Sequence, residues 1–292
     1  MNHLHQHRNA NILKTWTLIT LFLTLVIGLG YFSSFYFNNP QILYYFVFFS
    51  VFMSVLSYWF SDKMVLMMTG AKPADKKDFP EIYELVESLA KKANLPNPKI
   101  YIVKDSAPNA FATGRNPKNA LVAVTTGLLE RLNKDELEGV LAHELSHISN
   151  WDMLVSTVVV ILVGFVSILS NFFLRSMLWS GSRDDNNRGS GAVMMFLSII
   201  GAILVPLAAT LIQLAVSRKR EFLADASGAL LTKNPKGLAN ALEKISQYPQ
   251  SLKLANNTTA HLWFENPFRG RGVYKLFMTH PPVEERIKAL LG

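Results

Sequence analysis

Four long hydrophobic runs dominate the pattern of the chain. They occupy residues 15–37, 41–60, 154–174 and 192–217, and none of them contains Asp, Glu, Lys or Arg. A helix needs about 20 residues to cross roughly 30 Å of hydrocarbon, and each run reaches about that length. We therefore predict four transmembrane helices. Because only residues 38–40 join the first two runs, these two runs are expected to form a hairpin.

The polar regions outside these runs carry the periodicities of a mixed domain. Residues 79–94 place Ile82, Leu85 and Leu89 on one face at helical spacing. Short segments rich in Ile, Val and Tyr predict strands. Such segments predict strands at 99–103 and 120–125, and residues 109–114 between them are a third candidate strand that ends in a turn. The further predicted helices cover 134–151, 218–231, 235–247 and the chain from about 281 onward. We expect an α+β unit in which helices dominate.

This pattern divides the chain into five parts. They are a polar tail (1–14), a first transmembrane hairpin (15–60), a first soluble part (61–153), a second transmembrane hairpin (154–217) and a second soluble part (218–292). The tail is expected to be disordered. The fold class is therefore a mainly α, multi-pass membrane protein whose two soluble parts form one domain with a small β-sheet.

The composition supports a membrane protein. Half of the 292 residues are hydrophobic, only 17% are charged and the mean hydropathy is +0.20, whereas soluble proteins carry about 25% charged residues. The chain contains no cysteine. Disulfide scaffolds, thiol catalysis and cysteine-ligated zinc are therefore excluded, and a transition-metal site would have to use His, Asp or Glu.

The basic residues indicate the orientation in the membrane. The net charge is +8, and the regions 61–152 and 218–292 each hold 12 of the 29 Lys and Arg residues. Cytoplasmic segments of membrane proteins collect Lys and Arg. We therefore expect both termini and both soluble parts on the cytoplasmic side of a cell (inner or plasma) membrane. The same rule accounts for the basic balance, so nucleic acid is not an expected partner.

The sequence His143-Glu144-Leu145-Ser146-His147 carries the chemistry. It matches HExxH within a predicted helix, where positions i and i+4 lie one above the other. Both imidazoles can therefore bind one ion, and Zn²⁺ suits imidazole and carboxylate ligands. Glu144 lies beside that face and can reach a water molecule at the ion without being a ligand.

A third ligand is expected from the second soluble part. Glu221 and Asp225 share one helix face just after the fourth hydrophobic run. On their own they resemble a solvated pair next to Arg218 or Lys219, because i,i+4 charge pairs are common. The second hairpin, however, returns the chain to the membrane face that it left after His147. Glu221 is then expected to reach the metal, and Asp225 to orient an imidazole by accepting its second N–H.

Four motifs resemble the HtpX family of membrane zinc metallopeptidases, which are related to CAAX prenyl-protein endopeptidases. They are LAHELSH at 141–147, REFLAD at 220–225, NAFA at 109–112 and THPP at 279–282. The resemblance covers nearly the whole chain except the tail and the 183–191 loop. It implies a zincin-like domain with one Zn²⁺ per chain, His143, His147 and Glu221 as ligands, and Glu144 as the catalytic base.

The same resemblance implies two further assignments. Asn109, Ala110, Phe111 and Ala112 would bind the substrate backbone as an edge strand, and the alternative is an ordinary buried edge. His280 would stabilise the oxyanion, and the alternative is a residue that caps the last helix, since Pro favours a first helical turn. Arg286 would assist His280.

The expected function is cleavage of membrane or membrane-proximal proteins on the cytoplasmic side, in membrane-protein quality control and the stress response. A prenyl-peptide protease is an alternative with the same chemistry. An intramembrane protease is disfavoured, because Lys134, Asp135 and Glu136 precede the motif. A non-enzymatic scaffold or transporter is the alternative from another class. It is disfavoured because the hydrophobic runs hold no Asp, Glu, Lys or Arg. The oligomeric state stays open.

Overall fold

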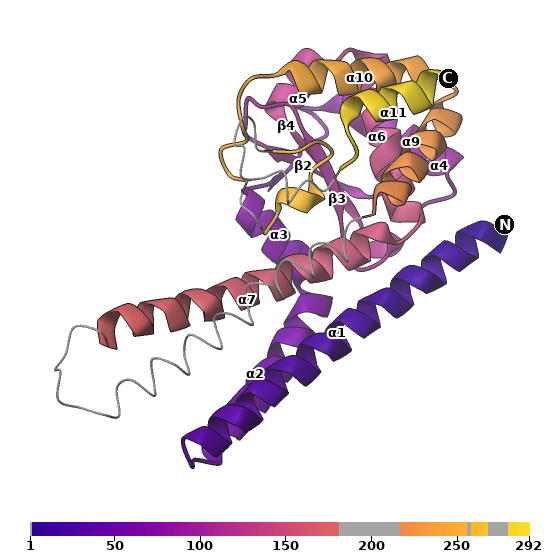
Figure 1. The fold of residues 1–292 in the computed structure, drawn as a ribbon. Helices are drawn as coiled ribbons and strands as arrows, with labels where there is room; N and C mark the ends of the chain where they lie inside the picture. Colours follow the sequence, from indigo (N-terminus) through magenta and orange to yellow (C-terminus); the bar gives the residue numbers. More distant parts are fainter. Residues whose placement is uncertain (1, 181–216, 256–257, 268–279) are drawn as a thin grey trace.

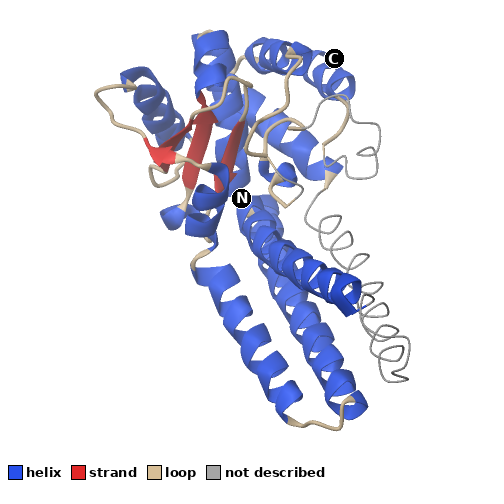
Figure 2. Ribbon diagram, turned by 90° about the vertical axis from the view of Figure 1, so that its left-hand side faces the viewer, coloured by secondary structure: helices blue, strands red, loops and turns tan. Residues whose placement is uncertain are grey.

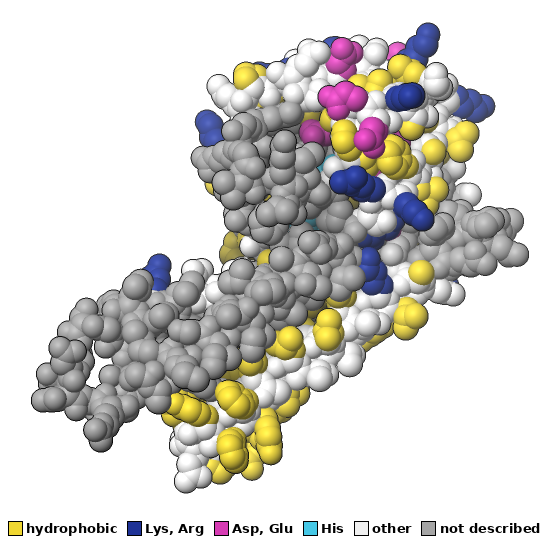
Figure 3. Space-filling model, in the orientation of Figure 1, with side chains coloured by type: hydrophobic (Ala, Val, Ile, Leu, Met, Phe, Trp, Pro, Cys, Tyr) yellow, Lys and Arg dark blue, Asp and Glu magenta, His cyan; other side chains and the backbone are white. Residues whose placement is uncertain are grey.

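A computed structural model describes residues 2–180, 217–255, 258–267 and 280–292. Long helices form an elongated lower part, and shorter helices and a sheet form a globular upper part (Figure 1). The space-filling view has hydrophobic side chains along the elongated part, whereas acidic side chains gather on the globular part (Figure 3).

Two described helices are long and apolar enough to cross a membrane, namely Arg8–Tyr36 and Gln41–Trp59. They lie in α1 (Asn2–Tyr36) and α2 (Gln41–Trp59), which form the expected hairpin. The third predicted span lies in α7 (Asp152–Ser180), whose first part passes the same test jointly with α6 (Lys134–Ser149) across a bend of 82°. The fourth predicted span, 192–217, lies outside the described residues apart from its last position.

The polar N-terminal segment differs from the expectation. Residues 2–14 are the beginning of α1, so the prediction of a disordered tail is wrong. The helix extends because α1 packs along α7, where Leu18, Phe22 and Val26 are buried against Val158 and Phe165. Both helices begin near the globular part and run away from it (Figure 1), so the polar start of α1 lies beside the residues that follow α6.

A four-stranded sheet lies in the globular part (Figure 2). Its strands are β1 (Lys72–Pro73), β2 (Lys99–Val103), β3 (Ala110–Thr113) and β4 (Leu121–Thr125), in the order β1-β2-β4-β3. β2 and β4 are parallel with Lys99 opposite Leu121, and the other two pairs are antiparallel. The three predicted strands are confirmed, and β3 is an edge strand. The pattern did not predict β1, which has only two residues, one of them Pro.

Helices surround this sheet. The remaining ones are α3 (Ser61–Thr69), α4 (Pro80–Lys92), α5 (Thr126–Arg131), α9 (Arg218–Thr232), α10 (Pro235–Gln247) and α11 (Val283–Leu291), with short 3₁₀ turns at Pro117–Asn119 and Ala260–Leu262. All four helices predicted in the soluble parts outside α6 are confirmed, whereas α3 and α5 were not predicted. The hydrophobic core joins the sheet to α4, α6 and α10 through residues such as Val86, Val122, Leu141 and Leu238.

The helix α6 is the centre of this arrangement. It begins at a capping box, in which the Asn133 side chain accepts from the Glu136 backbone N–H and the Glu136 carboxylate accepts from the Asn133 N–H. Most of its later residues are buried, because β3, α9 and α10 all contact it. A helix enclosed in this way holds its side chains at fixed positions, and the HExxH sequence lies in its last two turns.

Candidate metal centre

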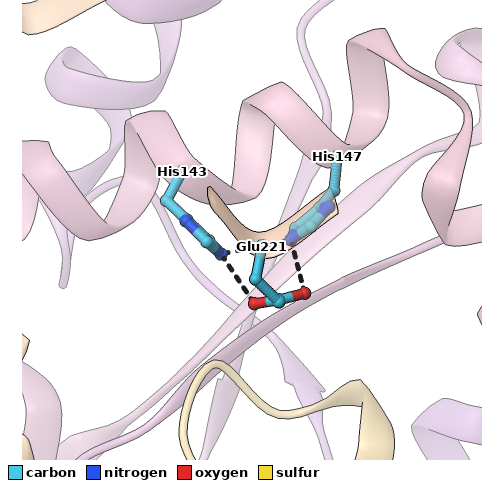
Figure 4. Close-up of side chains that lie close together, drawn as sticks. All are labelled: His143, His147 and Glu221. Atoms are coloured by element: carbon cyan, nitrogen blue, oxygen red, sulfur yellow. Dashed lines mark hydrogen bonds and ion pairs between the residues drawn. The ribbon is translucent and has the colours of Figure 1, made fainter. Parts of the chain in front are cut away.

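His143 and His147 project from successive turns of α6 toward the same point (Figure 4). Their Nε2 atoms lie 3.1 Å apart. The side chain of His143 is fully enclosed, and that of His147 is 16% exposed. The i,i+4 spacing of the motif therefore produces the predicted pair of convergent imidazoles.

Glu221 completes the group from α9. Its two carboxylate oxygens lie 3.7 Å from His143 Nε2 and 3.6 Å from His147 Nε2 (Figure 4). A tetrahedral ion with bonds of about 2.0–2.2 Å requires donor atoms roughly 3.3–3.6 Å apart. The three distances of 3.1, 3.6 and 3.7 Å lie within about 0.2 Å of this range, so the three side chains can hold a single metal ion with small adjustments. Among the described residues, they are also the group of His, Asp and Glu side chains whose donor atoms converge closely enough to hold one.

Carboxylates on the far side of each ring indicate which nitrogen carries the proton. Asp225 Oδ1 lies 2.9 Å from His143 Nδ1, and Asp152 Oδ2 lies 3.1 Å from His147 Nδ1. Each Nδ1 is then the N–H, so the two Nε2 lone pairs and the Glu221 carboxylate face one another. Such an arrangement is repulsive unless a cation lies among them. A positive charge among these donor atoms would therefore stabilise the arrangement, as a bound metal ion does.

The pKa values of the two imidazoles also indicate that the site favours a positive charge. Burial lowers the pKa of the His143 imidazole to about 4, which leaves it in the neutral form that binds metals. Burial also acts on His147, but the hydrogen bond with Asp152 and the charge of Glu221 outweigh it and raise the pKa of this imidazole to about 9. Without an ion, a proton on His147 supplies the missing positive charge.

Arg286 fixes Asp225 from α11. Its guanidinium donates two hydrogen bonds, from Nε to Asp225 Oδ2 at 2.8 Å and from Nη2 to Oδ1 at 2.7 Å. Although Asp225 is buried, this pair lowers the pKa of its carboxyl to about 2. Arg286 also donates to the backbone oxygen of Phe264 and stacks on that ring at 4.8 Å. Arg286 therefore holds the carboxylate that lies behind His143.

Glu144 lies on the same pocket as the convergent donors. Its side chain is buried, and the nearby backbone amide of Ala112 in β3 favours its ionised form. Burial raises the pKa of this carboxyl to about 7. A carboxylate with such a pKa can both accept and release a proton near neutral pH.

His280 meets the site from the segment before α11. Its Nδ1 lies 2.9 Å from Glu221 Oε2, and its buried Nε2 has no hydrogen-bond partner among the described residues. Burial opposes protonation, but the charge of Glu221 prevails and raises the pKa of His280. The structure thus brings His280 to the pocket, with one nitrogen on a candidate ligand and the other unpaired.

The predicted substrate strand 109–112 is only partly open. The Asn109 amide donates to the Glu265 backbone oxygen at 2.8 Å and accepts from its N–H at 3.1 Å. The Phe264 N–H also bonds the Ala110 oxygen at 2.8 Å. Residues 263–265 therefore cover the first half of the outer edge of β3. Phe111 packs edge-on against Trp263, and of the four residues only Ala112 lines the pocket.

Sequence reasoning missed Asp152, which faces His147, and the covering segment 263–265. Asp152 follows its imidazole by five positions across a helix break, so neither the i+3 nor the i+4 rule finds it. A sequence signal existed nonetheless, since Asp152 is an acidic residue two positions before a hydrophobic run. No pattern marks 263–265, because its contacts are mainly backbone hydrogen bonds.

Comparisons with known proteins agree with this geometry. Residues 76–292 match Peptidase family M48. A "Protease HtpX homolog" from Caldanaerobacter subterraneus is 43% identical over 98% of this chain and 97% of its own length. One from Pyrococcus abyssi is 46% identical over 95% and 94%. The crystal structure of Saccharomyces mikatae Ste24p has a TM-score of 0.51 at 18% identity, covering 98% of this chain and 67% of Ste24p, which indicates a shared fold.

Proposed function

The chain belongs to Peptidase family M48, the HtpX-type metalloproteases, and from this membership we propose that His143, His147 and Glu221 hold its catalytic metal. The single observation that carries the assignment is the convergence of three donor side chains at mutual distances of 3.1, 3.6 and 3.7 Å. Membership in a family of enzymes also excludes the scaffold or transporter interpretation.

Zinc is the metal that we propose, one ion per chain. Two imidazole nitrogens and one carboxylate are the donors of catalytic zinc sites that retain a free position. When bound, the ion supplies Lewis acidity, which lowers the pKa of a water molecule toward neutrality and polarises a carbonyl oxygen. The carboxylates of Asp225 and Asp152 keep each Nδ1 protonated, so that both Nε2 lone pairs remain available to the ion.

Glu144 is the proposed base and acid of peptide hydrolysis. Its carboxylate lies on the pocket beside the three donors, and Ala112 lines the same pocket. It accepts the proton of the attacking water and then delivers that proton to the leaving amine. His280 is proposed to stabilise the oxyanion through its unpaired Nε2, since the Glu221 carboxylate on Nδ1 favours a protonated ring.

The outer edge of β3 is the proposed substrate-binding strand. Asn109 and Ala110 act indirectly, because they anchor residues 263–265 beside the pocket. Phe111 supports them through its contact with Trp263. Ala112 is the residue at which an extended peptide meets the pocket, and main-chain hydrogen bonds from Ala112 onward would align it.

The proposed substrates are membrane or membrane-proximal proteins, cut on the cytoplasmic side during membrane-protein quality control. Met153 and Ser156, at the start of α7, line the same pocket as Glu144. The catalytic residues thus lie within two helical turns of a proposed membrane span. Segments of a substrate that lie close to the membrane would therefore also lie close to the pocket. This proposal includes four spans, with 61–153 and 218–292 as the two halves of one cytoplasmic catalytic domain. The shared fold with Ste24p by itself does not indicate a prenylated substrate.

The assay that tests this function compares two forms of one unfolded reporter. The purified full-length chain in liposomes is given the reporter either fused to a single membrane helix or free in solution. Zinc-dependent cleavage is expected for both, and it should be much faster for the tethered form. Equal rates would contradict the membrane-proximal substrate class, and cleavage that persists after chelation would contradict the metal mechanism.

A further inference from the structure

The N-terminal membrane helix reaches the metal centre through a single side chain. Asn11 of α1 is buried, with 7% of its surface exposed. Its amide nitrogen donates two hydrogen bonds, one to the Asn150 backbone oxygen at 2.9 Å and one to Asp152 Oδ1 at 2.8 Å. Both hydrogens of the amide are therefore used at the junction between α6 and α7.

That junction decides where Asp152 lies. α6 ends at Ser149 with Asn150 as its C-cap, the next residue Trp151 has a positive φ of 62°, and α7 then leaves at 82° to α6. A left-handed backbone is costly for a large side chain, so surrounding contacts must hold it. The Asn11 amide supplies such a contact, because it bonds one group on each side of Trp151.

Asp152 is the point where three helices meet. Its Oδ2 faces His147 Nδ1 of α6 at 3.1 Å. Its Oδ1 accepts from Asn11 of α1 and, at 3.3 Å, from the Arg220 guanidinium of α9. Arg220 immediately precedes Glu221. The carboxylate that orients one proposed ligand is thus held between the N-terminal helix and the residue next to another proposed ligand.

We propose that Asn11 is a positioning residue of the metal centre and that α1 is a structural part of the active site as well as a membrane span. By fixing Asp152, Asn11 fixes the tautomer and the ring orientation of His147. The inference rests on the proposed function, since it concerns the same metal site. It adds a residue far away in the sequence, in a segment whose composition alone suggests a dispensable tail.

The expected consequence is a change in metal affinity. Partners that orient a metal-bound imidazole typically contribute 10–100-fold to affinity or activity. Asn11 acts one contact further away, so Asn11→Ala is expected to weaken zinc binding by about tenfold, the lower end of that range. Asn11→Asp is expected to weaken it more, because it replaces a donor by a charge that repels Asp152.

The experiment is a double-mutant cycle on the full-length protein in detergent. The zinc dissociation constants of wild type, Asn11→Ala, Asp152→Asn and the double variant are measured by competition with a chromophoric chelator. The visible spectrum of the Co²⁺-loaded protein reports the ligand geometry. If Asn11 acts through Asp152, Asn11→Ala should weaken binding on its own but add little to Asp152→Asn. Additive effects, or wild-type affinity and an unchanged spectrum in Asn11→Ala, would overturn the proposal.

Two further variants keep the result interpretable. Asn9→Ala lies two positions earlier on the same helix and is exposed, so it should bind zinc as wild type does. If Asn11→Ala does not fold, Asn11→Ser, which keeps one donor, enters the cycle with the same two outcomes. Stoichiometric zinc in wild type tests the proposed metal site separately. A wild type without zinc refutes that site, whereas a zinc-loaded wild type matched by the Asn11 variants refutes only this inference.

Discussion

Gly228 of α9 lies directly against the backbone of His143 in α6. A Cβ atom at position 228 would lie 3.0 Å from the His143 nitrogen, closer than side chains normally approach. This close approach lets the two helices pack tightly, and Glu221, two turns earlier on α9, thereby reaches both imidazoles. The proposed metal centre therefore depends on a residue without a side chain.

Replacing Gly228 by Val is expected to separate α9 from α6. Overpacking of this kind costs typically 1–3 kcal/mol, and the displaced Glu221 would bind metal more weakly. Thermal unfolding and zinc affinity measure the two effects. Gly28→Val on α1 is the matched control, because no atom lies within 4 Å of the added Cβ. If the two variants have equal unfolding temperatures and zinc affinities, α6 and α9 can accommodate the larger side chain, and the close approach at Gly228 is not required.

Glu144→Gln is expected to retain zinc and lose cleavage by about 10²–10⁴-fold, because the amide cannot take up the proton. Metal analysis and casein hydrolysis on the same sample measure both. Glu138→Gln, on the same helix, removes only a partly exposed pair with Lys92 at 3.3 Å and should cleave normally. Undiminished cleavage by Glu144→Gln would remove it from the mechanism.

Arg286→Met is expected to destabilise the protein strongly. It leaves the buried Asp225 carboxylate without its partner, and breaking a buried ion pair in this way costs about 3–5 kcal/mol. Lys288→Met, on an exposed position of the same helix, provides the comparison and should change stability little. The unfolding temperature of the metal-free protein reports the difference. A similar temperature for both variants would mean that Asp225 does not need Arg286.

The same pair predicts how stability depends on pH. The pKa of Asp225 is lowered from 3.8 to about 2 in the folded protein, so its contribution is present above pH 3.8 and is lost as the pH falls toward 2. That loss amounts to about 2 kcal/mol. The free energy of unfolding of the metal-free wild type should therefore fall between pH 3.8 and pH 2. The free energy of unfolding of Asp225→Asn should lack this contribution to the fall. The same pH dependence of the unfolding free energy in wild type and Asp225→Asn would contradict the lowered pKa of Asp225.

Much of the site could be predicted from local spacing. The i,i+4 rule gave the pair His143 and His147, and the return of the chain after a hydrophobic hairpin gave Glu221 a position near them. The strands 99–103 and 120–125 followed from short runs rich in β-branched residues. These features depend on neighbours in the sequence or on the membrane, and both are visible in the order of hydrophobic and polar residues.

Asp225 was expected to orient an imidazole, and it lies behind His143. The other contacts behind the proposed ligands could not be predicted, because they join distant segments. Asp152 meets its imidazole across a helix break, and Asn11 reaches Asp152 from the N-terminal segment, 141 positions earlier in the sequence. The first residues were misjudged as a disordered tail because their polarity hides a helix that packing on α7 stabilises. Similarly, Asn109 carries a family motif, but its amide holds residues 263–265 rather than facing the pocket.

The most direct test of the account is the zinc content of wild type beside Glu221→Ala, measured on the purified full-length proteins after dialysis. We expect about one zinc per wild-type chain and a large loss in Glu221→Ala, because two imidazoles remain and the third donor is gone. Glu243→Ala, an exposed position on α10, should retain the metal. Full zinc content in Glu221→Ala would contradict the three-ligand site on which the mechanism rests.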